Sequence, residues 1–115
     1  MKKSSKDFPV FQKEFTYWQQ KLGCTGYKVY FKHKPLDECF AQVSFGDENM
    51  VMTACLNSKL PEKDRPHKDV KQSAKHEAIH VMLHRLEQLA VSRYVRNGEI
   101  YEATEELVFK LERLL

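Results

Sequence analysis

Residues 75–84 read KHEAIHVMLH and lie in the middle of the longest helix that the sequence predicts. From about residue 69 to residue 95 apolar residues recur at helical spacing. They are Val70, Ala74, Val81, Leu83, Leu86, Leu89 and Ala90. Asp69 or a neighbour is suited to begin this helix, and Asn97-Gly98 is typical of a helix end. We therefore expect one long helix with a buried face, and its histidines on that helix.

Two strand candidates precede the long helix. Residues 39–45 (CFAQVSF) and 50–56 (MVMTACL) are short, apolar segments of the kind that forms strands. The four residues from Gly46 to Asn49 that separate them are typical of a hairpin turn. Residues 57–69 are polar and contain two prolines, which predicts a surface loop. An antiparallel hairpin followed by a loop should therefore lead into the helix.

A third strand is expected at residues 27–34, YKVYFKHK. Tyr27, Val29 and Phe31 alternate with polar residues, which is the pattern of a strand with one face in water. His33, near its end, is expected to be exposed. We expect the three strands to form a meander, antiparallel at least in the hairpin.

The sequence predicts one further helix at each end of the chain. Residues 8–22 place Phe11, Phe15, Trp18 and Leu22 on one face and end before Gly23, whereas residues 1–7 are expected to be flexible. The last segment, EIYEATEELVFKLERLL, is amphipathic. Its expected core side consists of Leu107, Val108, Leu111, Leu114 and Leu115.

The order of the elements predicts a single α+β domain over residues 1–115. It consists of an N-terminal helix, a three-stranded, mainly antiparallel sheet, a long helix and a C-terminal helix. The length leaves no room for a second domain.

Charge and composition argue against several classes of protein. The net charge is only +3 and the basic residues are interleaved with acids, which does not favour a nucleic-acid partner. The sequence contains no apolar run of about 18 residues, so it predicts no membrane span. Its N-terminus lacks the apolar core of a signal peptide. Three widely spaced cysteines fit a reducing cytoplasm, where Cys39 and Cys55 should be small buried hydrophobes. We expect a cytoplasmic monomer.

The pattern H-E-x-x-H at residues 76–80 carries the chemistry. On a helix, residues i and i+4 project from the same face one turn apart, so His76 and His80 can offer two imidazole nitrogens to one Zn²⁺. Glu77 can reach a water in the metal's open position and take its proton as the water attacks a carbonyl group. The residues therefore predict a zinc site with Glu77 as general base.

A third metal ligand has to come from elsewhere in the chain. His84 continues the histidine stripe, but its Cα should lie about 12 Å from that of His76, which favours a place at the rim of the site. The C-terminal helix offers four glutamates: Glu99, Glu102, Glu105 and Glu106. Glu105 lies at the edge of the apolar face and is our choice, with Glu106 as runner-up.

With these residues located, the chain resembles the zincin-like metallopeptidases. It looks most like small phage and prophage proteins related to the SprT-like and ImmA/IrrE-type groups. The resemblance covers the segments WQQKLGCTGYKVYF, FAQVSF, MVMTACLN, HEAIHVMLHRLEQLA and EELVFKLERLL. It is specific in the H-E-x-x-H core and rests on pattern and spacing elsewhere.

The resemblance implies that His76 and His80 bind zinc, that Glu77 is the general base and that a residue near Glu105 completes the site. No histidine follows His84, so the third histidine of the SprT pattern is missing and a glutamate would serve, as in ImmA/IrrE-type sites. The resemblance also implies that one strand borders the cleft and pairs with an extended peptide, for which we choose residues 50–56.

A group that stabilises the transition state is also expected. Tyr94, Tyr101 and Arg93 are candidates, although packing or surface roles are more common for such residues.

Three functions are consistent with the sequence. The first is a zinc peptidase that acts on an intracellular protein, in the host cytoplasm if the chain is phage-encoded. The second is a non-catalytic zinc-binding relative that works as a regulatory or interaction module. The third, nucleic-acid binding, has only the Lys-rich strand at residues 27–34 and the basic pI in its favour.

Overall fold

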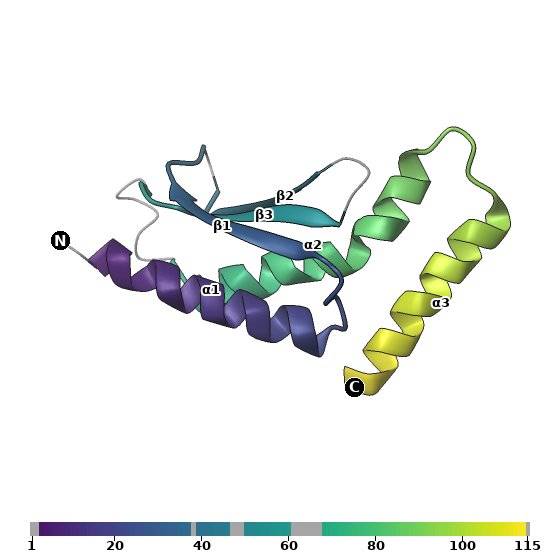
Figure 1. Cartoon of the computed structure of the whole chain (residues 1–115), viewed down its shortest axis with the longest axis horizontal. Helices are drawn as coiled ribbons and strands as arrows, with labels where there is room; N and C mark the ends of the chain where they lie inside the picture. The colour runs from purple at the N-terminus through teal and green to yellow at the C-terminus, as the bar shows by residue number, and fades with distance from the viewer. Residues whose placement is uncertain (1–2, 38, 47–49, 61–67, 115) are drawn as a thin grey trace.

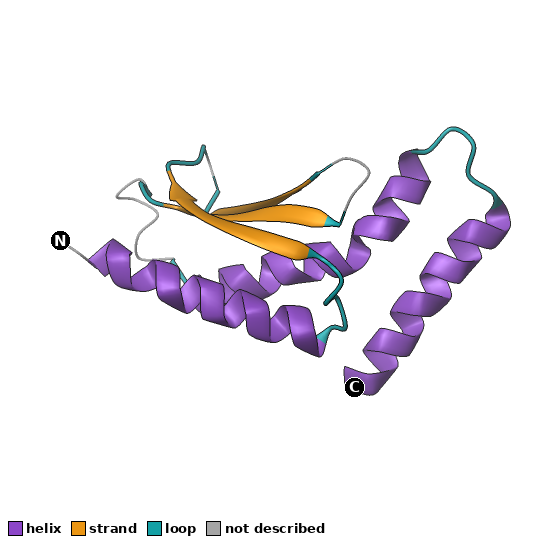
Figure 2. Cartoon of the chain, in the orientation of Figure 1, coloured by secondary structure: helices purple, strands orange, loops and turns teal. Residues whose placement is uncertain are grey.

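Helices cover one face of a small sheet. The computed structural model describes residues 3–37, 39–46, 50–60 and 68–114. The elements follow in the order α1 (Lys3–Lys21), β1 (Lys28–Lys34), β2 (Ala41–Phe45), β3 (Val51–Asn57), α2 (Val70–Val91) and α3 (Asn97–Leu114). α1 and α2 pack side by side under the sheet, and α3 turns back along the C-terminal half of α2 (Figure 1; Figure 2). The predicted α+β layout is confirmed.

The sheet is mixed, with the strand order β1-β3-β2. β2 pairs antiparallel with β3, as the predicted hairpin requires, whereas β1 pairs with β3 in parallel. The predicted meander is therefore wrong, because β1 joins the far side of β3 and not β2. The chain after β1 passes the end of β3 before it enters β2, so β3 is the central strand and β2 a sheet edge.

The buried side chain of Asn57, at the end of β3, holds this crossing in place. Its Nδ2 donates hydrogen bonds to the carbonyl oxygens of Leu36 (3.1 Å) and Cys39 (2.8 Å). Its Oδ1 accepts hydrogen bonds from the backbone N–H groups of Leu36 (3.1 Å) and Lys59 (2.8 Å). One amide thus ties both ends of the crossing segment to β3.

Replacing Asn57 by alanine should destabilise the fold by about 2–4 kcal/mol, because partly buried backbone groups lose their partners. The measurement is the free energy of unfolding from urea titration. Ser58→Ala is the control and should change it by less than about 0.5 kcal/mol. A change as small for Asn57→Ala would contradict the anchoring role.

The core lies between the inner face of the sheet and the helices. Phe11 and Phe15 of α1 are fully buried and meet the ring of Phe31 edge-on. On α2 the fully buried residues Ala74 and Ala78 leave room for α1 to pack closely. The other core residues are Leu22, Cys24, Ala41, Met52, Ala54, Leu56, Val81 and Met82.

Two helix boundaries differ from the prediction. α1 begins at Lys3, not at residue 8, so residues 3–7, expected to be flexible, are helical. Asp69 is the N-cap of α2 as predicted, but α2 ends at Val91. Asn97 and Gly98 do not end α2; they begin α3. The carboxylate of Glu99 accepts a hydrogen bond from the N–H of Arg96 (3.0 Å), which caps this helix start.

The predicted core side of α3 is only partly buried. Leu107 and Leu114 pack against the core, whereas Val108 (47% exposed) and Leu111 (41% exposed) remain in water. The reason is that α3 packs mainly against α2, so the apolar face of α3 is wider than the surface of α2 that covers it. Leu115 lies outside the described residues. No helix among the described residues is long and apolar enough to cross a membrane.

His33 also differs from the prediction, which was an exposed side chain. It is half-buried, and its ring stacks on Phe8 with centroids 5.0 Å apart. Its Nε2 has no hydrogen-bond partner within the described part of the chain. The alternation of β1 continues through residue 34, which turns His33 to the inner side together with Val29 and Phe31.

Candidate active site

The H-E-x-x-H segment of α2 opens into a cleft beneath the edge strand β2. Glu77, His80 and His84 line a hollow of about 610 Å³ together with Val43 and Phe45 of β2. An adjoining hollow of about 410 Å³ is lined by residues of the same two segments, among them Cys39, Ala41, His76 and Glu77. The two hollows share Cys39, Ala41 and Glu77, so we describe them together as the β2 cleft.

His76 and His80 lie one turn apart on α2, as predicted. The centroids of their rings are 5.0 Å apart and the ring planes are inclined at 72°. His76 is exposed and His80 is half-buried. Two neighbouring imidazoles that are open to the cleft fit a Zn²⁺ ion as donors.

Glu77 is buried between these histidines, with 8% of the residue exposed. Burial raises the pKa of its carboxyl group, whereas the charges of His76 and His80 and a backbone hydrogen bond from Val43 lower it. Burial is the largest of these effects, so the carboxylate holds a proton more readily than an exposed glutamate does. A carboxylate of this kind is suited to accept and return a proton.

Folding raises the pKa of Glu77, so its ionised carboxyl group lowers the stability of the fold at neutral pH. Below about pH 4 the group is protonated in both states and the fold has its full stability; this advantage is lost as the pH rises through the raised pKa. In the metal-free chain at pH 7, Glu77→Gln should therefore raise the Tm by roughly 3–6 °C, equivalent to about 1 kcal/mol. Thermal unfolding with a chelator present measures this. A Tm difference that grows below pH 4 would contradict it.

His84 forms part of the wall of the cleft. Its ring stacks on Phe45 with centroids 3.6 Å apart and planes at 9°, and Tyr27 meets both rings edge-on. Burial lowers the pKa of His84 more than the charge of Glu87 raises it, so the ring is mainly neutral at pH 7. This stacked position fits the rim of the site.

The structure does not bring the predicted third ligands to the histidine pair. Glu106 accepts hydrogen bonds from Arg85 (2.9 Å) and Lys110 (3.3 Å), and these cations hold its pKa below the usual range. Arg85 lies five residues after His80, which is about 140° around the helix. Glu105 is half-buried on the same helix as Glu106. In the described ranges, no three His, Cys, Asp or Glu side chains form a group that could hold a metal.

The candidate stabilising residues lie away from the cleft. Tyr94 is 84% exposed and Tyr101 is 68% exposed, and Arg93 is exposed as well. None of the three lines either hollow of the β2 cleft. Because α2 ends at Val91, these residues follow the H-E-x-x-H segment by at least one further turn and a change of direction.

The prediction that residues 50–56 pair with a peptide is wrong. This segment corresponds to β3, which is hydrogen-bonded to a strand on each side and has no free edge. The strand that borders the cleft is β2. No signal in the sequence distinguishes the two, since both are short apolar segments of the same hairpin.

The hydrogen-bond pattern of β2 shows what its free edge offers. The N–H of Gly46 bonds to Val51 and that of Asn57 bonds to Phe40, both at 2.9 Å. In an antiparallel pair every second residue is bonded to the partner strand. The N–H and C=O groups of Ala41, Val43 and Phe45 therefore point away from β3, over the cleft.

The position of Cys39 in the cleft was not expected from the sequence. It was expected to be buried, but it is half-buried and lines both hollows of the β2 cleft. Burial and then the charge of Glu77 raise the pKa of its thiol. It lies just before β2, which is why its side chain reaches the cleft. Cys55 is buried as predicted, and Cys24, Cys39 and Cys55 are all free thiols.

No family model matches this chain, and the comparisons with curated proteins and with solved structures found no match.

Proposed function

We propose that this protein is a zinc-dependent peptidase that hydrolyses peptide bonds of a protein or peptide substrate. The observation that carries the proposal is the buried carboxylate of Glu77, flanked by the imidazoles of His76 and His80 beneath the free edge of β2. A buried acid at this place costs stability, which makes a purely structural role a poor explanation.

His76 and His80 would hold the ion. Glu105 and Glu106 are not grouped with them in the described residues, so either glutamate would have to approach the pair to become the third ligand. When bound, zinc supplies an acidic water and polarises the carbonyl group that the water attacks. Glu77 takes the proton of that water and passes it to the leaving amine. Its raised pKa suits both steps, since a group of very low pKa would keep no proton to return.

The substrate is held as an added strand. The backbone groups of Ala41 and Phe45 and the carbonyl group of Val43 face away from β3 along the cleft, while the N–H of Val43 donates to Glu77. An extended peptide satisfies such groups by pairing with the edge. Backbone pairing brings a carbonyl group over Glu77 regardless of sequence. A peptide in this position replaces water along the whole edge.

A non-catalytic peptide-binding module is the alternative. One observation favours it: the described residues place no third ligand beside His76 and His80. The same β2 edge would bind the peptide in both cases. A module without zinc differs from the peptidase in metal content and in turnover, whereas a non-catalytic zinc-binding relative differs from it in turnover alone.

Metal content distinguishes the peptidase from the module without zinc. Elemental analysis of purified wild type is expected to find about one zinc per chain, and His80→Ala should lose it. Loss in only one of Glu105→Ala and Glu106→Ala would name the third ligand. His84→Ala is the control and should keep the metal. A wild type that neither carries zinc nor takes it up would exclude the peptidase.

A further inference from the structure

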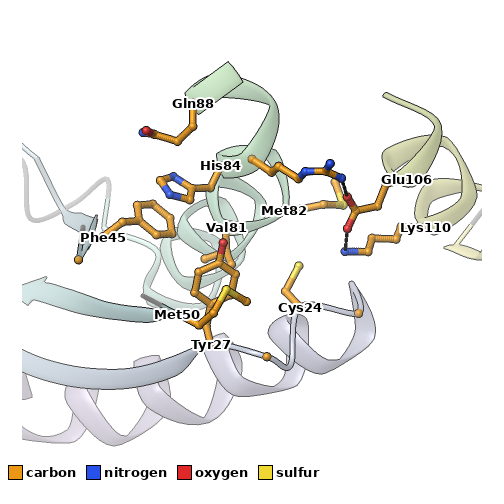
Figure 3. Close-up of a pocket in the computed structure, with 14 residues that line it drawn as sticks. Cys24, Tyr27, Phe45, Met50, Val81, Met82, His84, Gln88, Glu106 and Lys110 are labelled. Atoms are coloured by element: carbon orange, nitrogen blue, oxygen red, sulfur yellow. Dashed lines mark hydrogen bonds and ion pairs between the residues drawn. The ribbon is translucent and has the colours of Figure 1, made fainter. Parts of the chain in front are cut away.

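A larger pocket adjoins the β2 cleft and has no part in the function proposed above. Its volume is about 1000 Å³, and it lies where the α1–β1 connection, the end of β2, α2 and α3 meet (Figure 3). Its apolar lining consists of Cys24, Tyr27, Phe45, Met50, Val81 and Met82. We call it the aromatic pocket, because the rings of Tyr27, Phe45 and His84 form one of its walls.

The aromatic pocket continues the cleft. Phe45, His84 and Gln88 line both of them, so the stacked rings of Phe45 and His84 form their common wall. Phe45 is also the last residue of β2 with backbone groups on the free edge. A strand advances about 3.4 Å per residue, so a peptide residue opposite Phe45 is about 7 Å from the one opposite Val43. A peptide on this edge therefore reaches the pocket two residues along.

Charges in the pocket compensate one another. Arg85, Lys110 and Glu106 line it, and Glu106 is bonded to both cations. Glu102, which is not among the lining residues, also pairs with Arg85, so each cation already has a carboxylate partner. Figure 3 shows the Glu106 and Lys110 pair on the α3 side, opposite the rings of Phe45 and His84. A charged side chain would find no free counter-charge, which favours an uncharged occupant.

The apolar lining favours an aromatic occupant. The rings of Tyr27, Phe45 and His84 offer edges and faces to another ring, and aromatic pairs gain energy beyond the burial of area. Met50 and Met82 add flexible thioethers that adapt to a ring and make favourable sulfur–aromatic contacts. The volume holds such a side chain together with the backbone that carries it.

We propose that the aromatic pocket binds an aromatic side chain of the peptide that pairs with β2, about two residues from the segment over Glu77. This rests on the peptide-binding part of the proposed function and applies equally to the non-catalytic alternative.

The test selects peptides by binding, so that it does not depend on turnover. The full-length Glu77→Gln chain, supplied with zinc, is used to enrich a display library of random 12-residue peptides. We expect Phe, Tyr or Trp at one fixed position to be enriched about 10-fold or more.

Two variants then localise the binding. Met50→Asp introduces a charge into the pocket and should weaken binding of the best peptide at least about 10-fold. Gln88→Trp should do the same, because it fills the common mouth. Tyr17→Asp is the matched control, since Tyr17 is as exposed as Met50 (51% and 52%) but lies outside the pocket. It should leave the affinity unchanged.

Three results would overturn the proposal that the pocket binds an aromatic side chain. They are the absence of any enriched peptide, enrichment without an aromatic position, and an affinity that neither pocket variant changes. The zinc measurement separates this failure from that of the peptidase. If a chain without zinc binds aromatic peptides, the proposed pocket is supported and the peptidase is excluded. If cleavage depends on Glu77 but shows no aromatic preference, the peptidase is supported and the proposed pocket is excluded.

Discussion

Glu77→Gln is expected to abolish peptide cleavage while the bound zinc remains. Glutamine keeps the size of the side chain and its hydrogen-bonding oxygen, but it cannot accept the proton of the attacking water. Loss of a general base costs about 10²- to 10⁴-fold in rate, which places residual activity near background. The carboxylate is not one of the proposed ligands, so about one zinc per chain should persist. Cleavage is followed by mass spectrometry of a peptide library incubated with each variant.

Glu87→Gln is the matched control. Glu87 is an exposed carboxylate on the same helix and lines the same cleft, but it lies ten residues beyond Glu77. Its loss should leave the rate within about twofold of wild type. Equal cleavage by wild type and Glu77→Gln would remove Glu77 from the reaction, and loss of zinc in Glu77→Gln would make it a ligand.

The parts of the site that could be predicted from the sequence are local. His76 and His80 lie on adjacent turns because any helix places residues i and i+4 together, and the apolar residues around them predict a helix. Asp69 caps α2 because a carboxylate at this place can accept the N–H of Gln72, three residues ahead. Each of these inferences spans at most two turns of chain.

The parts that could not be predicted depend on contacts between distant segments. The order of the strands is set where Asn57 binds Leu36 and Cys39, about twenty residues earlier. An asparagine after an apolar run reads as an ordinary turn residue, so periodicity gave no sign of this role. With the wrong strand order, the peptide edge was placed on β3 and not on β2.

The place of α3 is the second such case. A helical wheel ranks Glu105 and Glu106 by their distance from the apolar stripe, but it does not say which neighbour the stripe meets. In the structure the Arg85 guanidinium of α2 binds Glu102 and Glu106 of α3, so these two carboxylates face Arg85. The third ligand therefore depends on a packing choice that single-helix reasoning does not reach.

Val43→Pro should abolish peptide binding without unfolding the protein. The N–H of Val43 points away from β3 and donates to the carboxylate of Glu77, so proline removes that hydrogen bond but none to β3. The proline ring also occupies the space beside the free edge that a paired peptide needs. We expect at least a 10-fold loss of peptide affinity and of cleavage rate, with a Tm within about 5 °C of wild type.

Ser44→Pro, one residue further, gives the opposite result if the register is correct. Ser44 pairs with Thr53 in the bonded position, so proline breaks the ladder and should cost about 3 kcal/mol or more of stability. Val43→Ala keeps the N–H and should keep most of the binding. If Val43→Pro binds peptide as wild type does, the β2 edge is not the binding strand. If Val43→Pro unfolds the protein while Ser44→Pro does not, the unpaired backbone groups belong to Gln42 and Ser44, and the free edge offers a different set of donors to the substrate.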